Sequence, residues 1–167
     1  MLIALLLSYV VTKSITAPLS DAVRVTRAVA TGDLSVSCAT IGKDEPATLL
    51  RSMEGMVAEL RRFAQAQTEM ATAHGNGMIS HTIDASTFSG AYSQMAVAIN
   101  DLVATHVAVK TRMVEMVTGY SNGDLAQQME DLPGEERRIS DAINAVRESI
   151  GAISREIKAL VAAAGAG

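Results

Sequence analysis

Glycine recurs in this sequence at nearly equal intervals. Four of the glycines lie 45, 46 and 44 residues apart: Gly32, Gly77, Gly123 and Gly167. The first and the third are each followed by Asp-Leu, so the surroundings repeat as well as the spacing. A fixed period of this size is typical of stacked arrays, in which each unit contacts only its neighbours. The 167 residues are therefore expected to form successive units of one kind and not a single globule.

Composition favours long helices that meet along narrow seams. Hydrophobic residues make up 49% of the chain, aromatic residues make up only 3%, and there is no tryptophan. Aliphatic side chains of this kind interlock well between helices. The net charge of −4 and the lack of aromatic residues interleaved with Lys and Arg argue against nucleic acid as a partner. The single cysteine, Cys38, excludes an internal disulfide and is compatible with a reducing cytoplasm.

Three stretches carry apolar residues in alternating steps of four and three. The first contains Leu49, Met53, Met56, Leu60, Phe63, Gln67, Met70 and His74; the second runs from Tyr92 to Tyr120, and the third from Ile139 to Leu160. A sustained 3.5-residue period predicts three long helices, each with a left-handed coiled-coil seam. A shorter helix that starts near Pro18 is expected before Gly32.

The segments between these helices are too long for tight hairpins. About a dozen residues follow Gly32 before the next helix, which is enough to travel back along one helix and start a parallel one. Each glycine is expected to end its helix in the left-handed conformation. Apolar residues recur two and six positions after the glycines, where they are expected to pin the connector: Leu34 and Cys38, Ile79 and Ile83, Leu125 and Met129.

These patterns predict an all-α fold built from tandem helix–connector–helix units. The second helix of one unit is expected to continue as the first helix of the next. Two helices with one apolar stripe each cannot bury themselves well. A parallel coiled-coil four-helix bundle, formed as a homodimer, is therefore the expected completion, and a second copy of the chain is the first expected partner.

A charge-free apolar segment begins the sequence and ends immediately before Lys13. Twelve helical residues reach about 18 Å, whereas a bilayer core is about 30 Å thick. We expect residues 1–12 to be the cytoplasmic end of a transmembrane helix, with the residues after about Lys13 in the cytoplasm and the protein in the inner (cytoplasmic) membrane. A buried core helix or an artefactual start is the alternative. A signal peptide is disfavoured, because no basic residue precedes the apolar run and no small-x-small cleavage site is evident.

Several motifs of the first unit occur in the order known from one family. They are Pro18-Leu19, Gly32-Asp33-Leu34, Asp44-Glu45 and a helix with Leu49, Met53, Met56 and Leu60. In this order they resemble the HAMP domain, the parallel four-helix relay of histidine kinases, adenylyl cyclases, methyl-accepting chemotaxis proteins and some phosphatases. The family's usual Asp-Glu-x-Gly signature has alanine in place of glycine here. The resemblance implies signal-relay or structural roles for Pro18, Leu19, Gly32, Asp33, Leu34, Asp44, Glu45, Leu49, Met53, Met56, Leu60, Gly77 and Gly123.

Two later stretches resemble the HAMP-like units that follow the first HAMP domain in chemoreceptors. One contains Gly90-Ala91-Tyr92 and residues 98–102, and the other contains Gly123-Asp124-Leu125 and residues 141–144. This tandem arrangement favours a methyl-accepting chemotaxis protein as the parent. The expected division is a truncated transmembrane helix (residues 1–12), a HAMP domain (13–67), second and third HAMP-like units (68–115 and 116–160) and the start of a truncated fourth unit (161–167).

The resemblance implies transmembrane signal transduction. A HAMP relay passes a conformational signal from a membrane sensor to a cytoplasmic chemotaxis signalling domain, by shifting the balance between two packings of similar free energy. In the full-length protein the partners would be a chemotaxis kinase and a coupling protein. The relay region of a sensor histidine kinase or cyclase, and a purely structural coiled coil, are the alternatives.

An enzymatic role is not expected, because no nucleophile–base pair, metal cluster or nucleotide loop is evident. His74, His81 and His106 lack both a chelating spacing and a phosphoacceptor context, so neither a metal nor a cofactor is expected. Cys38 is expected to be a small buried hydrophobe and not a redox thiol, because its offset from the glycine matches that of the other connector residues.

One acidic pair stands out in the first connector. Asp44 and Glu45 precede the expected second helix, and each is expected to stabilise its start by about 0.3–1 kcal/mol through capping and the helix dipole. In a HAMP domain the same pair would also help to couple the connector to the helix. The residues alone do not separate these two roles.

Overall fold

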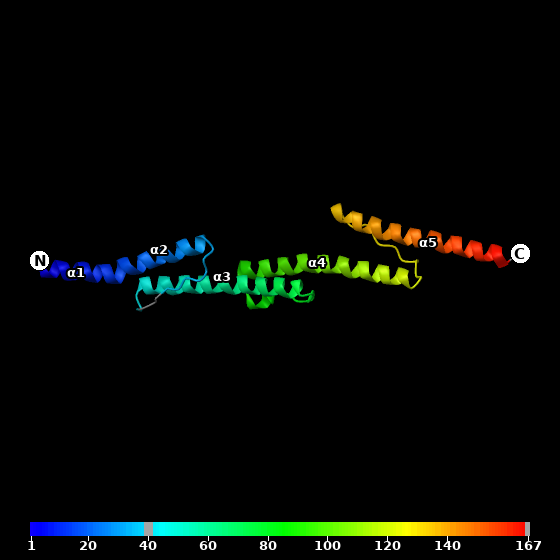
Figure 1. The fold of residues 1–167 in the computed structure, drawn as a ribbon. Coiled ribbons are helices and arrows are strands. Elements are labelled where there is room, and N and C mark those ends of the chain that lie inside the picture. The colour runs from blue at the N-terminus through cyan, green and yellow to red at the C-terminus, as the bar shows by residue number, and fades with distance from the viewer. Residues whose placement is uncertain (39–41, 166–167) are drawn as a thin grey trace. The chain divides into compact units, whose positions relative to one another are not determined.

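The computed structural model describes residues 1–38 and 42–165. Within these ranges the chain is helical with irregular connectors and has no strand, which confirms the all-α class (Figure 1). The α-helices are α1 (Leu2–Val11), α2 (Ala17–Ala30), α3 (Glu45–Gly75), α4 (Gly90–Ser121) and α5 (Arg137–Gly165). Gly167, the expected stop of a fourth unit, lies outside the described residues.

The chain divides into two compact units, residues 1–97 and residues 98–167, and α4 crosses from one to the other. In the first unit α2 packs against α3. In the second unit α4 and α5 share one cluster of buried side chains. The three predicted long helices are present, with 31, 32 and 29 residues in α3, α4 and α5.

The helix that contains Pro18 starts earlier than the sequence predicted. Pro18 does lie in the first turn of α2, but helix continues back through a π-helical turn, Thr12–Thr16, to Leu2. Proline has no N–H to donate, and its ring clashes with the carbonyl four residues earlier in an α-helix. The preceding turn is widened, and the N–H of Ala17 donates to the carbonyl of Thr12, five residues back. The π turn thus accommodates the proline without ending the helix.

The N-terminal apolar segment belongs to a longer helical stretch. The stretch from Leu2 to Ala30 is 29 residues long and is the one helix in the described ranges that is long and apolar enough to cross a membrane. None of its most apolar window is buried, so the alternative of a buried core helix is not what the structure shows. Helix therefore continues past Lys13, the residue that ends the charge-free segment 1–12.

Three of the repeating glycines end helices in the same way. Gly32, Gly77 and Gly123 have φ of 83°, 85° and 84°. After each glycine, the next N–H donates to the carbonyl five residues back at 2.9 Å: Asp33 to Ala28, Met78 to Ala73 and Asp124 to Gly119. This is the Schellman arrangement, which satisfies carbonyls at a helix end and favours glycine because φ is positive. The predicted helix stops are confirmed at all three positions.

Gly77 and Gly55 offer a matched test of this backbone effect. Neither has any atom within 4 Å of the place where a Cβ would lie. Gly77→Ala is expected to destabilise the chain by about 1–2 kcal/mol, because a left-handed residue with a Cβ is strained. Gly55→Ala, in the middle of α3, is expected to stabilise it by about 0.5–1 kcal/mol. Urea unfolding followed by circular dichroism should show midpoint shifts of opposite sign, and shifts of the same sign would contradict this account.

Candidate functional site

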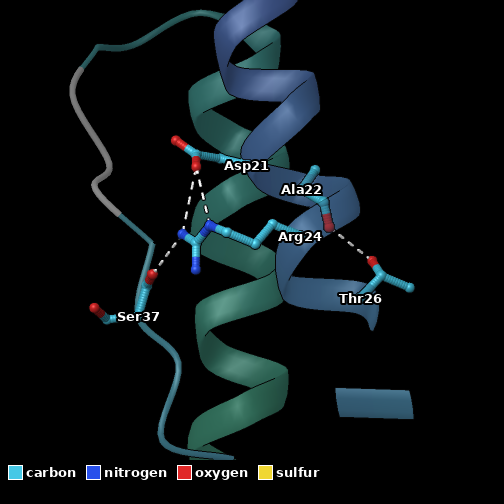
Figure 2. Close-up of polar contacts among 5 residues, drawn as sticks. All are labelled: Asp21, Ala22, Arg24, Thr26 and Ser37. Atoms are coloured by element: carbon cyan, nitrogen blue, oxygen red, sulfur yellow. Dashed lines mark hydrogen bonds and ion pairs between the residues drawn. The ribbon is translucent and has the colours of Figure 1, made fainter. Parts of the chain in front are cut away.

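The first connector is tied to α2 by one arginine. The side chain of Arg24 donates to Asp21 Oδ1 from Nε and Nη2, both at 3.3 Å, and to the carbonyl of Ser37 at 3.2 Å (Figure 2). Figure 2 also shows Thr26, a polar residue of the predicted seam, whose hydroxyl donates to the carbonyl of Ala22 at 2.8 Å. Arg24 therefore links the helix to a connector segment 13 residues later in the chain.

Two further arginines tie the same connector to α3. Arg61 Nε donates to the carbonyl of Leu34 at 3.1 Å, its Nη2 donates to the same oxygen, and Arg51 Nη1 donates to the carbonyl of Gly42 at 2.9 Å. As the connector advances from 34 to 42, its partners on α3 move back from 61 to 51. The connector therefore runs opposite to α3. It also runs opposite to α2, so α2 and α3 are parallel, as predicted (Figure 1).

The first connector shares one cluster of buried side chains with α2 and α3. The buried cluster contains Ala22, Val25, Cys38, Leu50 and Val57. Burial raises the pKa of the Cys38 thiol, and the charge of Glu54 raises it further against the opposing effect of Arg24. A thiol of this kind is a poor nucleophile at neutral pH. The prediction that Cys38 serves as a small buried hydrophobe is confirmed.

The second connector is held by aromatic and cationic groups. Arg62 Nη2 donates to the carbonyl of Thr87 at 2.7 Å, and its guanidinium lies 4.6 Å from the ring centroid of Phe88. Phe63 meets Phe88 edge to face, with ring centroids 5.5 Å apart. Ile83 is buried in this connector. An edge-to-face aromatic pair adds about 0.5–1.5 kcal/mol. A cation over a ring at an exposed site, such as the half-exposed Arg62 side chain, adds about 0.5–1 kcal/mol.

The third connector is held mainly by neutral groups. Asn144 of α5 accepts from the N–H of Met129 and donates to its carbonyl, both at 2.9 Å. Ser140, which is fully buried, accepts from the N–H of Leu132 at 3.2 Å. Tyr120 of α4 donates to the carbonyl of Gln127 at 3.2 Å. From Met129 to Leu132 the connector advances, while its partners on α5 move back from Asn144 to Ser140. This connector therefore also runs opposite to the helix that follows it.

Asn144→Asp tests the two-point bond to Met129. The carboxylate still accepts from the Met129 N–H but no longer donates, and it places a second oxygen opposite the Met129 carbonyl. A half-buried carbonyl without a donor costs about 1–3 kcal/mol, and we expect a loss of that size in unfolding free energy. Asn122→Asp, at an exposed helix end, is the matched control and should shift the urea midpoint much less. Equal losses for the two substitutions would contradict the assignment.

The apolar residues at the two connector offsets behave differently. Six positions after the glycine, Cys38, Ile83 and Met129 are all buried, as predicted. Two positions after it, Leu34 and Leu125 are half-buried and Ile79 is 44% exposed. Ile79 differs because the second connector turns sharply here: the N–H of Ile79 donates to the carbonyl of Gly77. Pinning at the second offset is therefore wrong for Ile79.

Helix α3 carries two apolar stripes, of which the sequence analysis recognised one. The residues buried within the chain at its N-terminal half are Ala47, Leu50 and Val57. The predicted seam lies beside them and is more open: Leu49 is 44% exposed, Met56 is 42% exposed, and Met53 and Leu60 are half-buried. The expectation of one stripe per helix was therefore wrong for α3. The seven-residue spacing of Leu50 and Val57 was a signal for the second stripe.

The remaining predicted residues lie near the ends of the helices. Asp44 is the N-cap of α3 and accepts from the N–H of Ala47 at 3.1 Å, so its capping role is confirmed; Glu45 follows in the first turn. Asp33 Oδ1 accepts from the hydroxyl and the N–H of Ser35, which lowers the pKa of Asp33. Upstream, Pro18 is half-buried and Leu19 is 47% exposed.

Two of the three histidine side chains contact a backbone carbonyl or a carboxylate. His74 Nε2 lies 2.8 Å from the carbonyl of His81, and His106 Nδ1 lies 3.7 Å from Glu136 Oε1. Within residues 1–38 and 42–165, no group of three His, Cys, Asp or Glu side chains is arranged to hold a metal ion. The interactions that recur in the described chain are hydrogen bonds between helix side chains and the backbone of the neighbouring connector, and these bonds hold the connector in position.

Three family models match the chain in succession. A HAMP domain model matches residues 10–62, a model of the second HAMP domain of the methyl-accepting chemotaxis protein McpB matches residues 57–105, and a model of HAMP N-terminal domain 3 matches residues 109–151. All three matches have helix–connector–helix geometry within them in this structure.

A curated relative is similar over most of the chain. The methyl-accepting chemotaxis protein McpB of Pseudomonas aeruginosa is 34% identical over 124 residues, which cover 72% of this chain and 18% of that protein. The chain therefore spans less than a fifth of the length of the relative that it matches.

Proposed function

Because this chain belongs to the HAMP-domain family, we propose that it relays a conformational signal from a membrane sensor to a cytoplasmic chemotaxis output. The observation that carries the proposal is the repeated unit itself: two parallel helices and a returning connector with a buried residue six positions after the glycine. We assign these units to residues 13–67, 68–115 and 116–160. The match to a chemotaxis protein favours this output over a sensor kinase or cyclase.

A relay needs rigid parts that move together. Helix α3 serves the first connector through Arg51 and Arg61 and the second connector through Arg62, so one helix belongs to two successive units. Packed helices of this kind have discrete arrangements, and a small displacement of one helix biases the next. The residues proposed to carry the displacement are the helix stops, the cap of α3 and its open stripe.

The input is proposed to come through the membrane. Helix α1 is apolar and exposed, and the helix continues into α2 through the π turn without a break. Lys13 Nζ lies 5.5 Å from the ring centroid of Tyr9, and a tyrosine next to a lysine at the end of an apolar helix is typical of a membrane interface. We place this interface near Lys13, in the inner membrane, with the residues after it in the cytoplasm.

A second copy of the chain is the proposed cover for the open stripe of α3. Leu49, Met53, Met56 and Leu60 follow steps of four and three, which is the spacing of a seam between helices. A parallel homodimer would turn each pair of helices into a four-helix bundle. In the full-length receptor the downstream partners are proposed to be a chemotaxis kinase and its coupling protein.

Disulfide cross-linking of the full-length receptor tests the relay. In a Cys38→Ala background, Met56→Cys is expected to form a disulfide with its copy in the partner chain, at a rate that changes several-fold when the sensor is stimulated. Ala58→Cys lies about 200° around α3 from Met56 and is the exposed control, which should cross-link slowly in both states. The same rate at Met56→Cys with and without stimulus would reject the relay.

A further inference from the structure

Adjacent residues in the middle of α3 hold two different connectors. Arg61 donates to the carbonyl of Leu34, two residues after the stop at Gly32. Arg62 donates to the carbonyl of Thr87, three residues before α4 begins. The carbonyls lie 27 residues before Arg61 and 25 residues after Arg62. The first connector, just after α2, and the second connector, just before α4, are thus both bonded to a single turn of α3.

The neighbouring contacts strengthen this attachment. The Arg62 guanidinium lies over the ring of Phe88 and pairs with Glu59 Oε2 at 2.6 Å. The next residue, Phe63, contacts Phe88 and also Tyr92 of α4, with ring centroids 5.9 Å apart in the second pair. Residues 61–63 therefore contact both connectors and the first turn of α4, all within the first compact unit.

The rigidity of an α-helix makes these contacts move together. Consecutive residues on a helix are fixed about 1.5 Å apart along the axis and about 100° apart around it. A rotation or shift of α3 that lengthens the bond from Arg61 to its carbonyl must also displace Arg62 from Thr87. Both carbonyls accept from guanidinium groups, whose donors lie in one fixed plane, so each bond depends on the direction from which its side chain approaches.

We propose that Arg61 and Arg62 form a joint that couples the first connector to the second. The inference rests on the proposed relay and names two positioning residues within it. Loss of either arginine loosens its own connector and, through α3, the connector of the neighbouring unit. The coupling is a property of the single turn of α3 that holds both connectors, and it requires no chain of side chains between them.

The native cysteine provides a reporter in the first connector. Cys38 is buried and its thiol has a raised pKa, so its alkylation requires the connector to open. Ile83, at the same offset in the second connector, is also buried, and Ile83→Cys in a Cys38→Ala background gives the matching reporter. Alkylation by iodoacetamide is measured on the full chain in lipid nanodiscs, with helix content checked by circular dichroism.

The deciding results are the remote effects. Arg62→Gln is expected to raise the alkylation rate of Cys38 at least about threefold, although no bond joins Arg62 to the described part of the first connector, residues 33–38 and 42–44. Arg61→Gln is expected to raise the rate at Ile83→Cys by a similar factor. Arg51→Gln is the control, because Arg51 also bonds the first connector, at Gly42, but lies about three helical turns before the turn that holds both connectors. Its loss should raise the alkylation rate of Cys38 and leave the rate at Ile83→Cys unchanged.

Two outcomes would overturn the joint. One is that each arginine affects only the reporter in its own connector. The other is that Arg51→Gln raises the alkylation rate at Ile83→Cys as much as Arg61→Gln does. That result would indicate that any loss of an arginine loosens the whole of α3. Neither readout depends on signal output. The joint and the relay can fail separately. If the remote effects are found but the full-length receptor shows no stimulus-dependent cross-linking at Met56→Cys, the relay is rejected and the joint stands.

Discussion

Replacing Met129 with alanine is expected to destabilise the pair of helices α4 and α5 by about 2–5 kcal/mol, because truncation of a buried side chain removes its transfer free energy and leaves a cavity. Met129 is 3% exposed and belongs to the buried cluster with Met116, Tyr120 and Ile143. Its backbone is fixed on both sides by Asn144, so the connector has little freedom to collapse into the gap. Urea unfolding monitored by circular dichroism measures the loss.

The repeat supplies the comparison series for this prediction. Ile83→Ala, at the same offset, is expected to lose a similar free energy, whereas Cys38→Ala removes one sulfur and is expected to lose only about 1 kcal/mol. Ile79→Ala is the control within the second connector, since Ile79 is 44% exposed whereas Ile83 is 4% exposed. A loss at Ile79→Ala as large as the loss at Ile83→Ala would contradict the assignment of the buried offset.

Features that depend on local chain geometry were predictable. A glycine that ends a helix needs only its own positive φ and the bonds of the preceding turn, and the three stops occur where the period placed them. The long helices follow from the 3.5-residue spacing, which is also local. The capping bond of Asp44 joins residues three positions apart. In each case the deciding interaction lies within a few residues of the pattern.

Features that depend on distant partners were not predictable in the same way. The bonds of Arg61 and Arg62 join residues more than 20 positions apart, and arginine is common on exposed helix faces for reasons of solvation alone. Asn144 lay in a recognised motif, but the motif did not say that its amide would bond Met129. The π turn before Pro18 could not be told from a helix start in the sequence, because proline is tolerated both in a first helical turn and after a widened turn.

Replacing Leu50 with alanine is expected to destabilise each chain by about 2–5 kcal/mol, since Leu50 is 3% exposed and packs in the cluster with Val25 and Cys38. Leu49 is the matched control, because it is the same residue type one position earlier, is open to solvent in the single chain and lies on the proposed dimer seam.

Two measurements distinguish the role of Leu50 inside the chain from the proposed role of Leu49 in the dimer. Leu50→Ala is expected to speed alkylation of Cys38 at every protein concentration, because it opens the cluster inside the chain. Leu49→Ala should leave that rate unchanged at high concentration and instead raise the dissociation constant of the dimer in sedimentation, since burial of a leucine at a helix seam contributes about 1.5–3 kcal/mol. If Leu49→Ala leaves the association unchanged, the open stripe of α3 is not a seam between copies, and the dimer proposal fails while the packing within each chain stands.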